Sequence, residues 1–323
     1  MPEQLIEIED LYVNYKIYEG ILKVLNGVQF KVGEREKVGL IGESGCGKTT
    51  TMRAIMRILA DNAMVPNGRI LYKGKDTLKM SDDEIQRIRR EHVSMIFQDP
   101  TAALNPVFTV GDQLIDVIRY STKREKLTKK EMMDRAIKVL KDVALPDPER
   151  ILKNYPVMLS GGMRQRICIA MALVSAGDLL IADEPGTNLD VTIEDQILRL
   201  IGRLVEERGT SIILISHALG AVKGLVDKVY VMYAGNMVEV APTRDLFSEP
   251  LHPYTSNLFK TVPKLTGGGI PQAIKGRIPD YINPPQGCRF SSRCEQAMPI
   301  CMKEQPPSMS AGEGRSVACF LYG

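Results

Sequence analysis

GESGCGKT at Gly42–Thr49 is the stretch of this 323-residue chain that decides its fold. Glycines at positions 42, 45 and 47 allow backbone conformations that are unfavourable for residues with side chains. Several backbone N–H groups can then converge on one anion, and a following helix adds its positive N-terminal end. The flanking residues predict a strand at Lys37–Ile41 and a helix at Thr49–Leu59. A strand, a glycine-rich loop and a helix in this order indicate a phosphate-binding loop in an α/β protein.

The side chains of this loop suit a nucleoside triphosphate with Mg²⁺. Lys48 supplies a point charge for the β- and γ-phosphates, and Thr49 offers a hydroxyl to the metal. A glycine-rich loop can arise by chance, but the flanking strand and helix make a phosphate site the better interpretation. We expect the following residues to contact the nucleotide: Gly42, Glu43, Ser44, Gly45, Cys46, Gly47, Lys48, Thr49 and Thr50.

Two carboxylates follow a second apolar run. Leu179–Ala182 is short and continuously apolar, as in a strand that is buried on both faces of a parallel sheet. Its carboxyl end, where ligands bind in open α/β sheets, carries Asp183 and Glu184. We expect Asp183 to support Mg²⁺. Glu184 is the candidate general base, a role worth ~10²–10⁴-fold in rate. The alternative is a pair of solvated carboxylates before a turn.

LSGGMRQR at Leu159–Arg166 predicts a helix N-terminus that offers unpaired N–H donors at Ser160, Gly161 and Gly162. This would be a second anion site in the same chain. We do not expect one polypeptide to direct both sites at the same nucleotide.

Gln98 and His217 also follow apolar runs, at Ser94–Phe97 and Ile212–Ile215. By residue type alone, each is an ordinary polar residue at the end of a strand. The set of motifs, in this order and spacing, resembles the ATPase subunit of an ABC transporter over most of the chain. The resemblance implies a P-loop ABC ATPase core of the α/β class, with an antiparallel β region and a helical subdomain.

The resemblance also implies roles for individual residues. Gln98 would contact Mg²⁺ and the attacking water, and His217 the γ-phosphate. Tyr15 would stack on adenine, with Tyr18 as second choice. The catalytic set is then Glu184, His217, Gln98 and Lys48, and the Mg²⁺ set is Thr49, Gln98 and Asp183. The signature of one subunit would close on the ATP of another through these residues: Ser160, Gly161, Gly162, Gln165 and Asp190.

Two positions depart from the family pattern. The turn after Glu184 reads Pro-Gly-Thr-Asn-Leu-Asp where related subunits usually have Pro-Thr-Thr-Ala-Leu-Asp, and Ala218 stands where an acidic residue is usual. Neither change removes an expected phosphate or Mg²⁺ ligand. Both concern the contact between subunits.

Four of the six cysteines lie in the tail, separated by five, six and seventeen residues: Cys288, Cys294, Cys301 and Cys319. Such a tail buries little apolar surface by itself, so a cross-link would help it fold. Two disulfides conflict with a reducing cytosol, and no signal peptide is visible. Spacing alone leaves a zinc site and a [4Fe–4S] cluster nearly even.

A subfamily resemblance favours the cluster. Gly287–Cys301 (GCRFSSRCEQAMPIC) resembles the cluster-bearing tail of dipeptide and oligopeptide importer ATPases, as do HPYT at His252–Thr255 and ALNP at Ala103–Pro106. The resemblance implies a [4Fe–4S] cluster on the four tail cysteines, with a structural role. It also implies that a groove near Gln98, lined by Leu104, Asn105 and Pro106, receives a helix from each membrane subunit.

Composition limits the partners. The net charge of +3 is too small to indicate nucleic acid binding. The best candidate for a membrane span, Ile167–Ala182, is interrupted by Gly177 and Asp178, so we expect membrane association through partner proteins. We divide the chain into an ABC nucleotide-binding domain at 1–265, with its helical subdomain at about 99–177, and a cysteine-rich domain at 266–323.

The resulting hypothesis is an ATP-hydrolysing subunit of an importer at the cytoplasmic face of the membrane. Its partners would be a second ATPase subunit, identical or different, two transmembrane permease subunits and, indirectly, an extracellular solute-binding protein. The subfamily resemblance implies a peptide as solute, with an oligosaccharide or nickel as alternatives. A DNA-repair or translation ATPase usually has two cassettes or a long coiled coil, and this chain has one cassette and no sustained heptad run. A non-hydrolysing regulator conflicts with the intact Lys48, Glu184 and His217.

Overall fold

The structure is a computed structural model that describes residues 4–121, 127–187, 189–261 and 273–323. These residues form two compact units, and each is treated separately below. The first unit takes its described residues from 1–32, 38–79 and 217–323, and the second from 33–37 and 80–216. The predicted domain boundary between residues 265 and 266 falls outside the described residues, as does the Gly267–Gly269 run.

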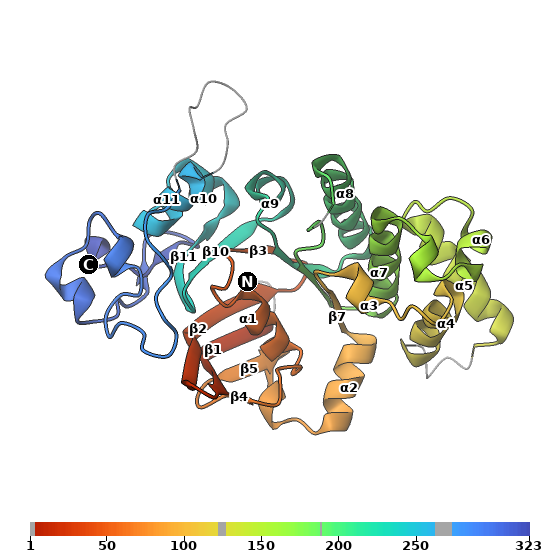
Figure 1. Cartoon of the computed structure of the whole chain (residues 1–323), viewed down its shortest axis with the longest axis horizontal. Helices are drawn as coiled ribbons and strands as arrows, with labels where there is room; N and C mark the ends of the chain where they lie inside the picture. The colour runs from red at the N-terminus through yellow and green to blue at the C-terminus, as the bar shows by residue number, and fades with distance from the viewer. Residues whose placement is uncertain (1–3, 122–126, 188, 262–272) are drawn as a thin grey trace. The chain divides into compact units, whose positions relative to one another are not determined.

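The first unit contains an antiparallel sheet built on two long strands, which confirms the predicted early β region (Figure 1). Its strands are β1 (Gln4–Ile17), β2 (Gly20–Gly33), β4 (Ala63–Met64), β5 (Arg69–Tyr72) and β6 (Lys75–Asp76). Along β1, the buried positions change from Ile6 and Ile8 to Leu11 and Val13. Asp10 has a φ of 47°, and this extra residue keeps both pairs on the buried face.

A second group of strands in the same unit carries the phosphate loop. The strands are adjacent in the order β12 (Met309–Ser310), β13 (Ser316–Val317), β11 (Asn236–Pro242), β10 (Lys228–Tyr233) and β3 (Lys37–Ile41). β3 and β10 run parallel, and the other neighbours are antiparallel. The helices of this unit are α1 (Lys48–Ile55), α9 (Leu219–Leu225), α10 (Thr243–Ser248) and α11 (Pro253–Lys260).

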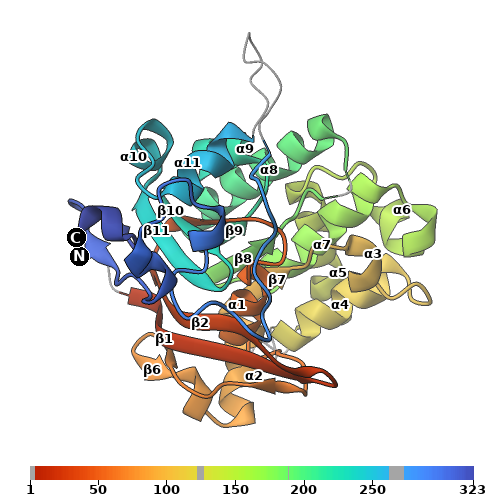
Figure 2. The same ribbon diagram turned by 60° about the vertical axis from the view of Figure 1, so that its left-hand side comes forward.

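The tail is built largely from turns and short 3₁₀ segments, and it folds onto the first unit beside β11 (Figure 2). Its strand β13 adds two residue pairs to β11, between Glu239 and Val317 and between Val240 and Ser316. The tail therefore extends the sheet that carries the phosphate loop.

The second unit holds three parallel strands in the order β9 (Ser211–Ile215), β8 (Leu179–Asp183) and β7 (Val93–Ile96). Every residue of these strands is buried. Continuous apolar runs of this kind are typical of strands covered on both faces. The predicted strands are thus confirmed, with ends that differ by one residue from the sequence-based bounds.

Helices make up the rest of the second unit. Their bounds are α2 (Asp82–Glu91), α3 (Pro100–Ala103), α4 (Val110–Ser121), α5 (Lys129–Asp142), α6 (Pro148–Lys153), α7 (Gly161–Ser175) and α8 (Val191–Arg208). Helices α4 to α7 pack on one another (Figure 1), which confirms the helical character predicted for 99–177. Within the described ranges, no helix combines the length and the apolar composition that a bilayer crossing requires.

The helix after the phosphate loop is shorter than predicted. The sequence indicated Thr49–Leu59, but α1 ends at Ile55. Arg57 adopts a left-handed conformation with a φ of 49°, and the Ile58 N–H returns to the Arg53 carbonyl at 2.9 Å. A left-handed residue closes a helix by this type of return bond. The apolar residues beyond Ile55 therefore belong to the turn.

Candidate functional site

The phosphate loop leaves β3 at Ile41, as predicted, and enters α1 at Lys48, one residue before the predicted start of the helix. Gly42, Gly45 and Gly47 have φ values of 154°, 78° and 111°, which L-residues rarely adopt. A Cβ at Gly42 would collide with the Met232 carbonyl oxygen. A Cβ at Gly45 would meet nothing within 4 Å, so this side of the loop is open. The open face and the start of α1 together fit a phosphate group.

The Lys48 side chain folds back against the backbone of the phosphate loop. Its side chain is buried, and its ammonium donates to the carbonyl oxygens of Gly42 at 2.8 Å and Glu43 at 3.0 Å. Cys46 is buried beside it, and burial raises the pKa of the Cys46 thiol. Cys46 therefore stays a neutral packing residue, and Lys48 supplies the positive charge.

Asp183 and Glu184 lie at the carboxyl end of β8, where the sequence predicted them. Asp183 is buried and ends the strand. Glu184 has a φ of 49°, a left-handed conformation that costs about 1–3 kcal/mol for a residue with a side chain. Its N–H donates to the Ile215 carbonyl at 2.9 Å, so strand pairing with β9 holds this conformation in place.

Gln98 contacts Glu184 directly, a hydrogen bond that the sequence analysis did not predict. The Gln98 Nε2 donates to the Glu184 carboxylate at 2.9 Å, and the Thr187 hydroxyl donates to the same oxygen at 3.2 Å. The carboxylate is thus oriented from two sides, while Gln98 itself is exposed. A fixed carboxylate with access to solvent suits a base that takes a proton from water.

The remaining nucleotide contacts expected from the sequence stay predictions. His217 is exposed two residues after the end of β9, and it belongs to the first unit. Tyr15 is half-buried in β1 opposite Ala63, and Tyr18 is fully exposed. The phosphate loop belongs to the first unit and the pair Asp183–Glu184 to the second.

The signature motif starts α7, as predicted. Ser160 is the N-cap, and its hydroxyl accepts the Met163 N–H at 3.3 Å. Ser160 is exposed, so the beginning of this helix can meet a partner. Gln165 is different, because only 1% of it is exposed. The side chain packs inside the second unit, and the expected contact of Gln165 with the nucleotide of another subunit stays a prediction.

The structure adds detail to two predicted contact surfaces, the groove for the membrane subunits and the contact between ATPase subunits. Leu104 is 2% exposed and belongs to the core, so only Asn105 and Pro106 of the predicted groove-lining trio are accessible. Asp190 caps α8 by accepting the Ile193 N–H at 3.0 Å, a structural task in addition to its expected position between subunits. The unusual Gly186 is buried, and a Cβ there would lie 2.9 Å from the carboxyl carbon of Glu194.

The four tail cysteines line one small cavity of about 20 Å³, together with His252, Phe290 and Phe320. All six cysteines of the chain are free, so the disulfide interpretation is not supported. Burial is the main cause that raises the pKa of Cys288 to about 11, and the neighbouring tail thiols contribute to this rise. Four thiols around one cavity are the donor set of an iron–sulfur cluster, whereas the cavity itself has room for about one water molecule.

A single zinc ion fits these cysteines less well. A tetrahedral site with Zn–S bonds of about 2.3 Å places its sulfurs ~3.8 Å apart. Among the described side chains, no three His, Cys, Asp or Glu residues are close enough to hold one metal ion. Among the described residues, neither the zinc ion nor the iron–sulfur cluster suggested by the sequence thus has a preformed metal site.

Sequence reasoning missed a set of tail residues that contact the core of the first unit. Arg293 binds Glu43, Tyr281 binds Gly45, and Arg289 binds the carbonyls of Lys23 and Ala234. Nothing in the spacing of the tail pointed to these contacts. HPYT was noted for its family likeness only, yet its Tyr254 accepts the Glu43 N–H at 2.8 Å.

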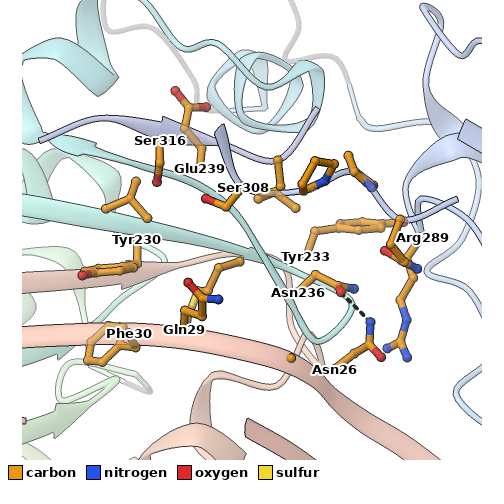
Figure 3. Close-up of a pocket in the computed structure, with 18 of the residues that line it drawn as sticks. Asn26, Gln29, Phe30, Tyr230, Tyr233, Asn236, Glu239, Arg289, Ser308 and Ser316 are labelled. Carbon is orange, nitrogen blue, oxygen red and sulfur yellow. Dashed lines mark hydrogen bonds between the residues drawn. The ribbon is translucent and has the colours of Figure 1, made fainter. Parts of the chain in front are cut away.

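A larger cavity of about 570 Å³ lies between β2, the β10–β11 hairpin and the tail (Figure 3). Tyr230, Tyr233 and Phe30 give it aromatic walls. At one end, Asn26 donates to the side-chain oxygen of Asn236 at 2.8 Å. Of the residues that line this cavity, the sequence analysis had singled out only Cys288, as a metal ligand.

Comparison with known families decides the identity. The sequence profile described as "ABC transporter" matches residues 25–187, and the profile described as "Oligopeptide/dipeptide transporter, C-terminal region" matches residues 238–301. This chain belongs to the ABC transporter ATPases. As a member of that family it is an ATPase, which confirms the function class expected from its motifs.

Curated relatives cover nearly the whole ABC ATPase chain. The dipeptide transport ATP-binding protein DppD of Bacillus subtilis is 43% identical over 99% of this chain and 95% of its own length. The oligopeptide transport ATP-binding protein OppD of Salmonella typhimurium is 41% identical over 98% of this chain and 93% of its own length. Within the family, the chain groups with the ATP-binding subunits of dipeptide and oligopeptide transporters.

Solved structures confirm the ABC ATPase fold. The cassette MJ0796, in a dimeric post-hydrolysis state with ADP and Pi, matches with a TM-score of 0.66 and 26% identity over 74% of this chain and 99% of its own. The cbiO1 protein from Clostridium perfringens, part of the transporter complex cbiONQ, matches with a TM-score of 0.63 and 27% identity over 76% of this chain and 92% of its own.

Proposed function

We propose that this ATPase powers the uptake of dipeptides or oligopeptides across the cytoplasmic membrane, from a peripheral position on the cytoplasmic face. The observation that carries the proposal is the near full-length likeness to ATP-binding proteins of dipeptide and oligopeptide transporters. The C-terminal match at 238–301 adds support from outside the ATPase motifs. An oligosaccharide or nickel importer would use the same ATPase chemistry and is the alternative.

In the proposed hydrolysis, the glycine-rich loop and Lys48 hold the phosphates. Glu184 takes a proton from the attacking water, and Gln98 keeps the carboxylate oriented through its 2.9 Å hydrogen bond. Thr49, Gln98 and Asp183 would hold Mg²⁺, which neutralises phosphate charge when bound. His217 would contact the γ-phosphate, and Tyr15 would stack on adenine.

The proposed working unit contains two ATPase subunits, identical or different, and two transmembrane permease subunits. A solute-binding protein would deliver the solute from outside. The start of α7, with Ser160 exposed and Gly161 and Gly162 half-buried, supports a second anion contact made across the dimer. Asp190 would lie at the same contact. ATP would favour the closed dimer because it binds that state more tightly than the open one.

We also propose that Cys288, Cys294, Cys301 and Cys319 hold a [4Fe–4S] cluster with a structural role. Support comes from the donor set around one cavity and from the free state of all four thiols. Each cysteine of such a cluster binds a different iron, so its sulfurs need not be as close as the ligands of one ion. We retain the division into a nucleotide-binding domain at 1–265 and a tail domain at 266–323 as part of this proposal.

Two measurements test these proposals separately. The first uses the complete transporter, with solute binding measured on its extracellular receptor. Peptide binding together with ATP-dependent peptide uptake would support the peptide assignment, whereas tight sugar or nickel binding without peptide binding would reject it.

The second measurement is anaerobic purification of the full chain, followed by absorption spectroscopy and analysis of iron, sulfide and zinc. Brown protein with about four iron and four sulfide per chain is expected for a [4Fe–4S] cluster. Colourless protein that contains zinc would reject the cluster and leave the ATPase assignment intact.

A further inference from the structure

The tail contacts the phosphate loop directly, although more than two hundred residues separate them in sequence. The contacts of the tail fall on Glu43 and Gly45, in the first half of the loop. All the residues involved belong to the first unit. They use both backbone and side-chain groups of the loop.

The strongest contact joins Arg293 to Glu43. The guanidinium binds the carboxylate with both terminal nitrogens, at 2.7 Å and 3.0 Å. Only 3% of the Arg293 side chain is exposed, compared with 26% for Glu43. Burial alone would lower the pKa of Arg293, but its hydrogen bonds to Glu43 and Tyr233 outweigh burial and raise it. A two-point pair of this kind fixes the orientation as well as the distance of its partners.

The backbone of the loop is held at two more points. The Tyr281 hydroxyl donates to the Gly45 carbonyl at 2.8 Å, and the Glu43 N–H donates to the Tyr254 hydroxyl at 2.8 Å. Burial raises the pKa of both tyrosines, so both phenols keep their protons. The Glu43 carbonyl in turn accepts the Lys48 ammonium at 3.0 Å. Holding Glu43 therefore also positions the carbonyl that Lys48 uses.

The residues that hold the loop are themselves anchored. Arg293 also donates to the carbonyls of Lys275 and Ile274, at 2.9 Å and 3.2 Å. Tyr233, Tyr254 and Phe290 form an aromatic cluster with ring centroids 4.6 to 5.4 Å apart. Arg289 connects the tail to the carbonyls of Lys23 and Ala234, beside the β10–β11 turn in Figure 3.

These contacts reduce the loss of backbone conformational entropy that a glycine-rich loop undergoes when it binds a ligand. Glycine loses more backbone freedom on ordering than any other residue, and three glycines here hold positive φ values. If the loop were free, binding a phosphate would have to order it. Contacts that order the loop beforehand remove that part of the cost of binding.

We propose that the tail is a positioning element for the phosphate loop, with Arg293 acting through Glu43 and Tyr281 acting through Gly45 to raise the affinity for ATP. Neither residue is assigned to touch the nucleotide. The proposal depends on the ATPase activity and is independent of the transported solute and of the metal content of the tail.

The test measures ATP binding to the full chain by titration calorimetry, and ATP hydrolysis by the complete transporter. Arg293→Ala should raise the Kd and KM for ATP by about tenfold. This factor corresponds to the lower end of the free energy that one charge-assisted hydrogen bond contributes. Because the lost contact acts before the chemical step, kcat should change by less than about twofold. Arg293→Lys keeps the charge without the two-point geometry and should fall between wild type and alanine.

Arg315→Ala is the matched control. Arg315 is another largely buried tail arginine, with 14% of its side chain exposed, and it donates to the Glu249 carbonyl at 2.7 Å, away from the loop. Its loss should lower the melting temperature of the protein while leaving the Kd for ATP unchanged. An equal rise in Kd for Arg315→Ala and Arg293→Ala would mean that any tail defect has this effect, and would overturn the proposal.

Two further variants keep the test decisive if Arg293→Ala does not fold. Tyr281→Phe removes one hydroxyl and should raise the Kd by about fivefold, the size of one hydrogen bond. In a Glu43→Gln background, Arg293→Lys should add little to the Kd, because the two residues act as a pair. Unchanged ATP affinity in Tyr281→Phe and Arg293→Lys, or fully additive effects with Glu43→Gln, would reject the proposal.

Discussion

Replacing Glu184 with glutamine tests the chemical role of this residue with little structural disturbance. The Gln98 amide and the Thr187 hydroxyl both donate to one oxygen of the Glu184 side chain. Glutamine has nearly the same size and keeps an oxygen that can accept both bonds. The backbone N–H that pairs with Ile215 is also retained. The substitution therefore removes the ability to take a proton and preserves the local geometry.

The expected loss follows from that single change. A positioned general base contributes ~10²–10⁴-fold, so Glu184→Gln should lower kcat by about two to four orders of magnitude, or ~2.7–5.4 kcal/mol of barrier. The base acts in the transition state, so the Kd for ATP should change by less than about threefold. Phosphate release by the complete transporter measures the first quantity, and calorimetry on the full chain measures the second. With ATP bound and not hydrolysed, the variant should accumulate as a closed dimer in gel filtration.

Thr187→Val is the matched control for this experiment. It removes one 3.2 Å hydrogen bond to Glu184 but leaves the carboxylate and Gln98 in place. The loss of one such bond corresponds to about a fivefold decrease in kcat. The reasoning fails if Glu184→Gln retains turnover within tenfold of wild type, or if Thr187→Val is as inactive as Glu184→Gln.

Three other predictions concern stability, the loop and the thiols. Burial lowers the pKa of His252 to about 4, whereas the unfolded chain takes up this proton near pH 6.5; stability should thus fall as the pH drops from about 6.5 towards 4. His252→Asn keeps a side chain that can cap the helix but cannot take up a proton, so the melting temperature should decrease less between about pH 6.5 and 4. The same pH dependence of the melting temperature in this variant and in wild type would contradict the assignment of this decrease to His252. Gly45→Ala should weaken ATP binding in calorimetry, because a φ of 78° costs a side-chain-bearing residue about 1–2 kcal/mol, and wild-type affinity would show that the loop tolerates a side chain there. Burial raises the pKa of Cys168 to about 12, so mass spectrometry should find it unalkylated by iodoacetamide at pH 8 in the folded protein, and rapid labelling would refute its burial.

Much of the fold could be predicted because its signals are local. The strands β7, β8 and β9 are short apolar runs, and their polar successors mark the carboxyl ends where the candidate residues lie. The phosphate loop was recognisable from its glycine spacing together with the flanking strand and helix. The role of Gln98 at the attacking water was implied only by family likeness, and its hydrogen bond to Glu184 was not predicted, since 86 residues separate the two positions.

The rest could not be predicted because its causes are tertiary. Gln165 stands in an exposed-looking motif, and only the packing around α7 shows that it is buried. The pair formed by Glu43 and Arg293 spans 250 residues and has no periodic or spacing signal. The shortened α1 depends on the left-handed Arg57, a conformation that residue type does not indicate.

The addition of β13 to β11 also determines how this protein can be shortened. β11 pairs with β10 on one side, and on the other it uses the backbone groups of Glu239 and Val240 to hold β13. Beyond β13 lies β12, only two residues long, and very short strands at a sheet border discourage pairing with other molecules. A chain cut before residue 309 would leave those backbone groups open and offer them to another copy of itself. The last fifteen residues thus cover the edge of β11 and prevent it from pairing with another copy. Truncation before residue 309 should therefore cause the protein to aggregate, although all its ATPase motifs are retained.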